Sequence, residues 1–188
     1  MAANRSGFSP RAMTPVLLIA SFCLVSCGDD NPVNPPKGAG TIVVTAATEL
    51  GDALENSVAG DTIDIRAEFS SPTFTMTKGY SIPASRSPVT IQGTPRFGFL
   101  RPEIVFPTDV VGITLTDHSG SKIRDLDFRG GADVISLVNS SAVIQGIVVR
   151  NNTRDGVAAT GPGSSGTVTL CLFDHPGRFG VSTGPGAS

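Results

Sequence analysis

The sequence predicts an all-β fold in which short parallel strands coil into a β-helix, a solenoid with one short helix near its N-terminal end. Three observations predict this fold. The chain combines 22 Gly and 14 Pro with only 16% charged residues, well below the roughly 25% of an average soluble protein. Short strands rich in Val, Ile, Thr and Ser recur at a period in the low twenties, which favours stacked strands and turns. A single amphipathic helix pattern precedes them.

The N-terminal segment, 1–26, has the organisation of a secretory signal peptide. Arg5 and Arg11 lie in a stretch without acidic residues, and an apolar run follows at 16–25. The run is shorter than the about 20 apolar residues of a membrane-spanning helix, and it lacks the polar face of a buried core helix. A basic start followed by a short apolar core predicts export.

The exit from this apolar run is a motif, Leu24-Val25-Ser26-Cys27, that resembles the lipobox of bacterial lipoproteins. The resemblance implies that Cys27 is acylated, becomes the mature N-terminus and attaches the protein to a membrane. Ordinary signal cleavage with a chance cysteine is the alternative. Gly28 follows, and because an Asp at that position signals inner-membrane retention in well-studied envelopes, the resemblance favours the outer membrane or cell surface.

Residues 27–40 are rich in Pro, Gly and polar side chains and leave nothing to bury, which predicts a flexible tether. The β-helix domain then occupies 41–188. Its last residue, Ser188, follows a Gly-Pro-Gly turn with no atypical polar repeat such as ends a solenoid. We therefore expect the domain to be an incomplete, N-terminal part of a longer β-helix.

The domain opens with a strand-like stretch at 41–45 and the one good helix candidate, at 48–58. Thr48 is a plausible N-cap and Gly60 a plausible stop. An alternating strand follows at once, within Gly60-Asp61-Thr62-Ile63-Asp64-Ile65. The helix has one apolar face at helical spacing, formed by Leu50, Ala53, Leu54 and Val58.

This opening, TELGDALENSVAGDTIDI at 48–65, resembles the start of many pectate-lyase-like proteins. The resemblance implies a right-handed parallel β-helix whose short helix covers the open end of the first coil. An uncovered end would present unpaired backbone groups to other chains. An independent βαβ unit and a β-sandwich are the alternatives, the latter because short, regularly spaced strands with turns between them also suit it.

From Val89 onward the chain aligns loosely with itself. The offset from Ile123 to Ile144 is 144 − 123 = 21, and that from Ile147 to Cys171 is 171 − 147 = 24. Such a period suits one turn of a parallel β-helix, whose coils bury their apolar faces by stacking. A second set of aligned strands begins at Val134, Gly156 and Gly180. The residues predicted to point inward are Leu126, Phe128, Ile147, Val149, Cys171 and Phe173.

Asp127 and Arg129 are the first weak candidates for catalysis. Pectate lyases of this fold hold Ca²⁺ on stacked outward carboxylates and abstract a proton with Arg or Lys, so the resemblance directs attention to Arg124, Asp125, Asp127 and Arg129. The predicted outward column, however, is Asp127, Val148 and Leu172. One acid and two aliphatic residues do not supply the six to eight oxygens that Ca²⁺ needs. A salt-bridged surface strand is the simpler interpretation, and we predict no metal site.

Glycoside hydrolases need two or three carboxylates around the scissile bond. Asp125, Asp155 and Asp174 lie on successive coils, but Asp155-Gly156 is also a turn signature. The other weak candidate is His175, with Asp174 and Arg178 nearby, for an acid–base role. A turn before Pro176-Gly177 explains His175 equally well.

Three further residues are expected to be structural. Cys171 is expected to be a small buried hydrophobe, and Asn151 to occupy a coil corner, where Asn tolerates positive φ. His118, beside Asp117 in a turn, lies too far along the chain from His175 to share a metal.

The net charge of −2 provides no basic footprint for nucleic acid. Export and the resemblance predict a cell-envelope lipoprotein that binds polysaccharide without clear catalytic residues and without a cofactor, with bound Ca²⁺ as the alternative. The alternatives are a fragment of a polysaccharide lyase or glycoside hydrolase, and a non-catalytic adhesin or structural module. A groove lined with Arg and Asp would favour the carbohydrate hypotheses, and a flat aliphatic face the structural one.

Overall fold

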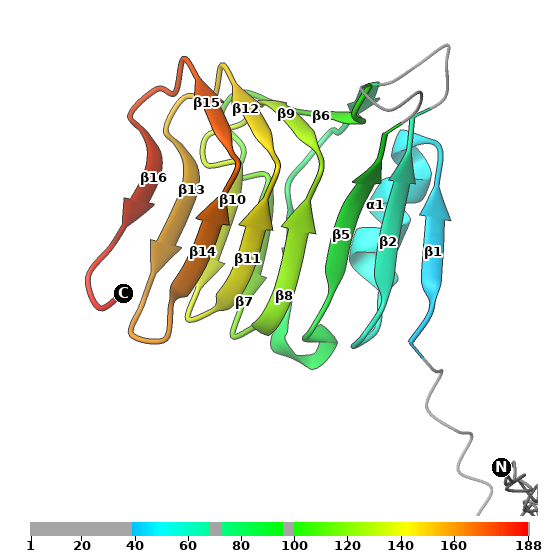
Figure 1. Cartoon of the computed structure of the whole chain (residues 1–188), viewed down its shortest axis with the longest axis horizontal. Helices are drawn as coiled ribbons and strands as arrows, with labels where there is room; N and C mark the ends of the chain where they lie inside the picture. The colour runs from blue at the N-terminus through cyan, green and yellow to red at the C-terminus, as the bar shows by residue number, and fades with distance from the viewer. Residues whose placement is uncertain (1–38, 68–72, 96–99, 188) are drawn as a thin grey trace, which may run out of the picture. The chain divides into compact units, whose positions relative to one another are not determined.

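Three parallel sheets form the body of the domain, and the chain visits them in turn (Figure 1). The computed structural model describes residues 39–67, 73–95 and 100–187. Sheet 1 contains β1 (Thr41–Val44), β2 (Thr62–Arg66), β5 (Thr90–Thr94), β8 (Ser119–Arg124), β11 (Ser141–Gln145) and β14 (Ser165–Thr169). Sheet 2 contains β3 (Thr73–Thr75), β6 (Glu103–Phe106), β9 (Asp127–Gly130), β12 (Val148–Arg150) and β15 (Leu172–Asp174). Sheet 3 contains β4 (Tyr80–Ile82), β7 (Ile113–Thr116), β10 (Ile135–Val138), β13 (Asp155–Thr160) and β16 (Phe179–Thr183).

Each passage through sheets 1, 2 and 3 returns the chain one rung further along, so the domain is a parallel β-solenoid of about six turns. The predicted all-β parallel fold is confirmed, whereas its right-handed sense stays a prediction. A single α-helix, α1 (Ala47–Asn56), and one 3₁₀ turn, η1 (Ala84–Arg86), are the only helical elements in the described ranges.

The predicted repeat is confirmed in the later coils. Ile135 pairs with Ile113 and with Val157, and the offset in sequence number is the same at both steps (135 − 113 = 157 − 135 = 22). The next offset, from Val157 to Val181, is 181 − 157 = 24. The earlier coils are longer. In sheet 1, the offset from Ile63 to Ile91 is 91 − 63 = 28, and that from Ile91 to Ile123 is 123 − 91 = 32. This difference explains why the repeat is visible only in the second half of the sequence.

The core runs along the axis of the coils as columns of like residues. In sheet 1 the inward column contains Ile63, Ile91, Ile123 and Ile144, all fully buried. β-Branched side chains pack well on a pleated surface, so isoleucine suits these four rungs and the β-branched Val168 follows on β14. Of the six predicted inward residues, Leu126, Phe128, Ile147 and Val149 are fully buried, while Cys171 and Phe173 are partly buried against the core.

Cys171 and Phe173 lie in the last described coil, which contacts a neighbouring described coil on one side and none on the other. Its large hydrophobic side chains are correspondingly exposed, and they are Leu170, Leu172, Phe179 and Val181.

The helix α1 covers the first coil, as predicted, because it contacts the strands β1, β2, β3 and β4 (Figure 1). Its buried face contains Leu50, Ala53 and Leu54. The predicted N-cap, Thr48, is wrong: Ala46 occupies that position, and Glu49 Oε2 accepts hydrogen bonds from the Thr45 and Ala46 amides at 2.8 and 3.1 Å. A carboxylate in the first turn satisfies donors that a helix leaves unpaired.

Residues in the left-handed region mark the corners between sheets. Sheet 1 leads to sheet 2 through Asp125, Gly146 and Leu170, which have φ of 58°, 63° and 54°. After the sheet 2 strands, Asn151 and His175 have φ of 54° and 53°. The predicted corner at Asn151 is therefore confirmed, and His175 occupies the same place one coil later.

The signal peptide (1–26), the lipidation site Cys27 and all but the last two residues of the tether (27–40) lie outside the described residues. Within the described ranges no helix is long and apolar enough to cross a membrane.

Candidate functional site

A groove of about 490 Å³ lies on the outward face of sheet 3. Two carboxylates and two guanidinium groups line it, from Asp133, Arg154, Asp155 and Arg178. The hydroxyls of Thr114, Ser136 and Ser182 also line it, and these residues occupy one outward column of β7, β10 and β16. Rows of hydroxyl, carboxylate and guanidinium groups give the groove both donors and acceptors of hydrogen bonds.

The groove follows from a local repeat at the start of each sheet 3 strand. Asp133 lies two residues before Ile135, and Asp155 two residues before Val157, which pairs with Ile135. Arg154 and Arg178 precede the same position in their coils. Each arginine reaches back one coil, so Arg154 pairs with Asp133 and Arg178 with Asp155. The triplets Ala-Asp-Val, Arg-Asp-Gly and Arg-Phe-Gly at 132, 154 and 178 carry this signal in the sequence.

Asp155 is the most enclosed acid of the groove, with a side chain that is 0% exposed. Arg178 Nε donates to its Oδ1 at 2.9 Å, Arg178 Nη2 donates to Oδ2, and Ser182 Oγ donates to Oδ2 at 2.6 Å. The hydrogen bond from Arg178 is the main cause that lowers the pKa of Asp155, and it outweighs burial, which raises that pKa. Asp155 is therefore a carboxylate at neutral pH.

Both carboxylate oxygens of Asp133 also have hydrogen-bond partners. Its Oδ1 accepts from the Asp155 amide at 3.2 Å, and Arg154 pairs with Oδ2. The two arginine side chains remain about half exposed, so part of each guanidinium faces the groove. Asp133 and Asp155 thus orient Arg154 and Arg178 toward whatever occupies the groove.

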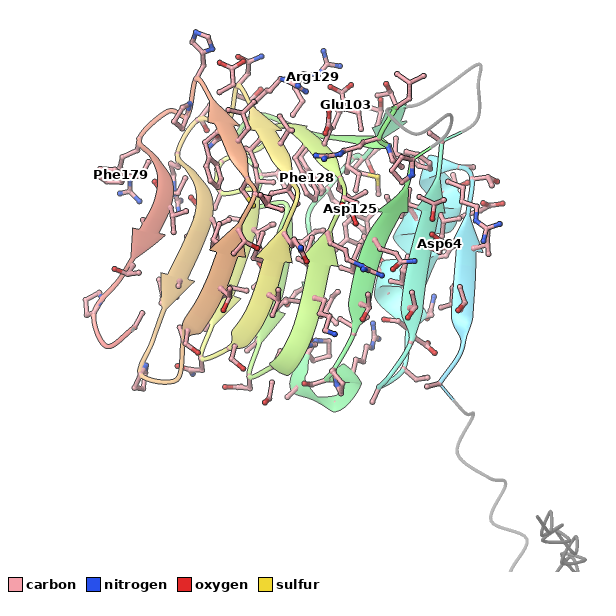
Figure 2. All side chains as sticks on the ribbon, in the orientation of Figure 1. Asp64, Glu103, Asp125, Phe128, Arg129 and Phe179 are labelled. Atoms are coloured by element: carbon pink, nitrogen blue, oxygen red, sulfur yellow. The ribbon has the colours of Figure 1, made fainter. Side chains whose placement is uncertain are left out.

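An aromatic ring lies at one end of the groove. Phe179 pairs with Asp155 in register, and its side chain is 54% exposed (Figure 2). The Arg178 guanidinium lies 5.6 Å from the centre of this ring, which is cation–π contact. An exposed ring beside fixed polar groups offers an apolar face and hydrogen bonds together.

Asp127 and Arg129, the first sequence candidates, lie on β9 in sheet 2 and do not line this groove. Asp127 Oδ2 lies 3.1 Å from Arg150 Nη1, and Arg129 Nη2 lies 3.5 Å from Glu103 Oε2 (Figure 2). The predicted outward column of Asp127, Val148 and Leu172 is present. Glu103 adds one rung before Asp127, at an offset of 127 − 103 = 24 that falls within the repeat period. Extending the repeat back by one coil is the sequence signal that would have found it.

His175 lies at the corner after β15 with its side chain 83% exposed. Its Nδ1 is 2.6 Å from Asp174 Oδ1, whereas Arg178 pairs with Asp155 instead of joining them. The set of three proposed around His175 is therefore reduced to two exposed residues.

The three acids considered for glycoside hydrolysis are distributed over different parts of the coil. Asp125 is at a corner of sheets 1 and 2, Asp174 ends β15 in sheet 2, and Asp155 begins β13 in sheet 3. Interpreting Asp155-Gly156 as a turn was wrong. Gly156 lies inside the strand, where a Cβ would come within 2.3 Å of the Phe173 ring, so close packing explains this glycine.

His118 is a buried structural residue. Its Nδ1 lies 2.8 Å from Ser121 Oγ, and its Nε2 lies 3.0 Å from the carbonyl oxygens of Ile82 and Pro83. The ring thus connects the corner after β7 to the preceding coil. Nowhere in the described ranges do three or more His, Cys, Asp or Glu residues form a group that could hold a metal ion.

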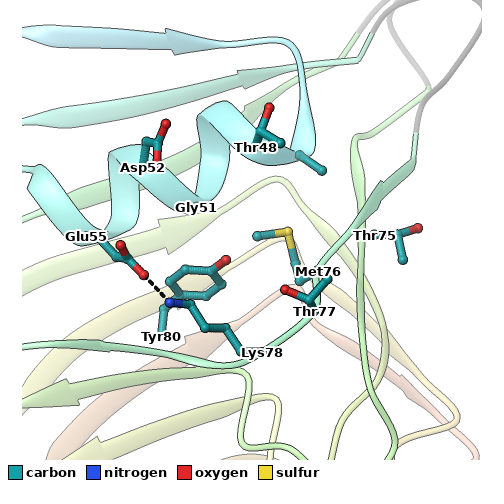
Figure 3. A pocket seen from close by; sticks show the side chains of 10 residues that line it. Thr48, Gly51, Asp52, Glu55, Thr75, Met76, Thr77, Lys78 and Tyr80 are labelled. Carbon is teal, nitrogen blue, oxygen red and sulfur yellow. Dashed lines mark ion pairs between the residues drawn. The ribbon is translucent and has the colours of Figure 1, made fainter.

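A second hollow, of about 280 Å³, lies between α1 and the segment before β4 (Figure 3). Lys78 Nζ is 2.5 Å from Glu55 Oε1 and 5.5 Å from the centre of the Tyr80 ring. Burial raises the pKa of Tyr80. These contacts attach the helix to the first coil, and we assign this hollow no ligand.

No protein-family model, curated protein or solved structure matches this chain.

Proposed function

We propose that this protein is an exported envelope lipoprotein whose β-solenoid binds polysaccharide along the groove of sheet 3 without catalysing a reaction. The arrangement of Asp133, Arg154, Asp155 and Arg178 in that groove carries the proposal. The acceptors and donors repeat from coil to coil, and neighbouring parallel strands lie about 4.8 Å apart. A row of repeating polar groups suits a ligand that itself repeats. The groove, lined with Arg and Asp, favours this function over that of a purely structural module.

The charge state of the groove favours binding over hydrolysis. A glycoside hydrolase needs one protonated carboxylic acid, whose pKa is raised. In Asp155 the pKa is lowered, chiefly by Arg178, and Asp133 is paired with Arg154. Each carboxylate is thus held by an arginine, and Asp155, whose pKa is lowered, is poorly suited to donate a proton. A lyase base is also disfavoured here, because a paired guanidinium does not give up its proton readily.

The proposal of export and anchoring is supported by the sequence alone. The basic start, the apolar run at 16–25 and the lipobox-like motif ending at Cys27 are the features of a lipoprotein leader. Acylation at Cys27 would hold the solenoid at a membrane through the tether. By the same resemblance, the outer membrane or cell surface is the favoured location.

A glycan-array screen on the full chain, purified in a non-ionic detergent, tests the binding proposal. We expect binding to one or more oligosaccharides, and Phe179→Ala should weaken it about 5- to 10-fold, corresponding to roughly 1–1.4 kcal/mol of lost aromatic contact. Arg129→Gln, an exposed position on sheet 2, is the matched control and should bind as the unaltered chain does.

Each other outcome has a definite meaning. A folded chain that binds no glycan contradicts the proposal and leaves the adhesin or structural alternative. Binding of acidic glycans that increases with Ca²⁺, together with release of unsaturated sugar products, supports the lyase alternative instead.

A further inference from the structure

A second groove, of about 360 Å³, lies on the outward face of sheet 1. β8 supplies two cationic side chains to it, Lys122 and Arg124, which are both exposed and two residues apart on one strand. The neighbouring strands supply only uncharged groups. These are the hydroxyls of Thr62 and Thr90 and the amides of Gln92 and Gln145.

Arg124 is oriented by a neutral partner. Gln92 Oε1 accepts hydrogen bonds from Arg124 Nε at 3.2 Å and from Nη2 at 2.6 Å. Gln92 is in turn held by Asp64, whose Oδ1 accepts from Gln92 Nε2 at 3.4 Å. The guanidinium is therefore positioned by an amide that does not neutralise it, and part of its donor fork remains available for an oxyanion.

The charge on this face differs from that of the other two sheets. Four arginines on the other two sides of the coil each pair with a carboxylate of the preceding coil: Arg129 and Arg150 in sheet 2, and Arg154 and Arg178 immediately before strands of sheet 3. Lys122 and Arg124 form no ion pair with any residue in the described ranges.

The strand register explains why no carboxylate neutralises Lys122 and Arg124. Lys122 lies between Thr90 and Val143, and Arg124 between Gln92 and Gln145. Asp64, one rung beyond Gln92, is already paired with Arg66 at 2.8 Å. Two positive charges thus face solvent over a polar groove.

We infer that this groove binds the carboxylate or sulfate groups of an anionic polysaccharide. Arg124 and Lys122 together receive one oxyanion, and the amide of Gln145 and the hydroxyls of Thr62 and Thr90 receive hydroxyls of the adjoining sugars. This site is separate from the groove of sheet 3, and it adds selection by charge to the proposed function, on which it rests. The acceptor that suits both cations is an oxyanion with two or more oxygens, because a guanidinium binds such groups through paired N–H donors.

Calorimetric titration of the full chain in non-ionic detergent tests this inference with three size-matched probes. Alginate oligosaccharides offer carboxylates, sulfated dextran offers sulfate esters, and plain dextran offers neither. We expect at least one anionic probe to bind, and the comparison of the two identifies the anion. The double variant K122Q/R124Q should bind it at least 10-fold more weakly, with a shallower dependence of affinity on salt.

Two further variants separate a built site from general attraction between charges. R129Q/R150Q removes two positive charges from sheet 2 and should leave the affinity within 2-fold. Gln92→Leu keeps both cations but removes the amide that orients Arg124, and it should weaken binding by about 3- to 5-fold.

An equal loss in K122Q/R124Q and R129Q/R150Q would overturn the inference, as would equally tight binding of duplex DNA or anionic vesicles. Failure of both anionic probes to bind would also overturn it. If a neutral glycan still binds and Phe179→Ala weakens that binding, the proposed function of sheet 3 stands while the site on sheet 1 does not.

Discussion

The guanidinium of Arg178 crosses from one coil to the next to reach the buried carboxylate of Asp155, with Nε 2.9 Å from Oδ1. Asp155 begins β13, and Arg178 immediately precedes β16, the next strand of the same sheet. Because Asp155 is enclosed, its negative charge depends on this partner and on Ser182. The pair therefore connects two coils and orients a cation at the groove.

Asp155→Asn should lower the free energy of unfolding at pH 7 by about 1.5–3 kcal/mol, the range for hydrogen bonds to a charged group. The folded-state pKa of Asp155 lies below its unfolded value, so its stabilisation is complete above the unfolded pKa of about 4. It disappears as pH falls through the folded pKa. Urea unfolding from pH 7 to pH 2 should thus show the two proteins converging in acid. Asp127→Asn, in a more exposed pair on sheet 2, should change stability by less than about 1 kcal/mol.

Phe128→Ala should destabilise the domain by about 3–5 kcal/mol. The ring is fully buried and stacks on Phe106 with centroids 6.4 Å apart, so truncation leaves a cavity in the column of sheet 2. Denaturant unfolding followed by circular dichroism measures this loss. A loss below about 1 kcal/mol would show that this column is not closely packed. The stability of Phe128→Leu should lie between that of the unaltered domain and that of Phe128→Ala.

Leu170→Gly should stabilise the domain by about 1 kcal/mol. Leu170 has φ of 54° and a side chain that is 82% exposed, and Gly146 occupies the same corner one coil earlier. The left-handed region is unfavourable for a residue with a Cβ by roughly 1–2 kcal/mol, part of which the greater freedom of glycine in the unfolded chain offsets. A higher midpoint of thermal unfolding checks this expectation. A lower midpoint would mean that the leucine side chain makes contacts that matter.

Cys27→Ser should abolish acylation and leave the leader attached. Mass spectrometry of the chain from a bacterial expression host, after membrane fractionation, measures both effects. The unaltered chain should begin at a diacylated or triacylated Cys27 and sediment with membranes. Cys171→Ser, the control, should keep the lipid. A soluble chain cleaved elsewhere would support ordinary secretion with a chance cysteine.

Parts of the coil that obey a nearly constant period could be predicted from the sequence. Ile123 and Ile144 align because they are separated by one short coil, and their β-branched side chains mark the same inward rung. The longer coils around Ile91 do not share this period, so their strand pairing could not be predicted from the repeat. Glu103 lies 127 − 103 = 24 residues before Asp127, so its position was predictable by extending the repeat back by one coil. The predicted start of the helix was wrong because Glu49, a residue inside the helix, accepts the hydrogen bond of the N-cap amide. The sequence pattern had instead favoured the side chain of Thr48 as the cap.

The groove of sheet 3 was harder to predict for a physical reason. Its two ion pairs join residues of different coils, with sequence offsets of 154 − 133 = 21 for Asp133 and Arg154 and 178 − 155 = 23 for Asp155 and Arg178. Only the three-dimensional register brings such residues together, and Asp155-Gly156 has the composition of a turn. The packing of Phe173 against Gly156 determines that this dipeptide is strand.

The column of isoleucines in sheet 1 also determines which changes in gene length the fold tolerates. Four consecutive rungs present an inward isoleucine and the next presents Val168, which is also β-branched, so adjacent coils are nearly interchangeable at that position. An in-frame duplication or deletion of one whole later coil, such as the step from Ile135 to its partner Val157 in sheet 3, restores the column and the strand pairing. A change of half that length would place outward polar residues in the core. Such solenoids can therefore diverge by gaining and losing whole coils while the strands that remain keep their partners.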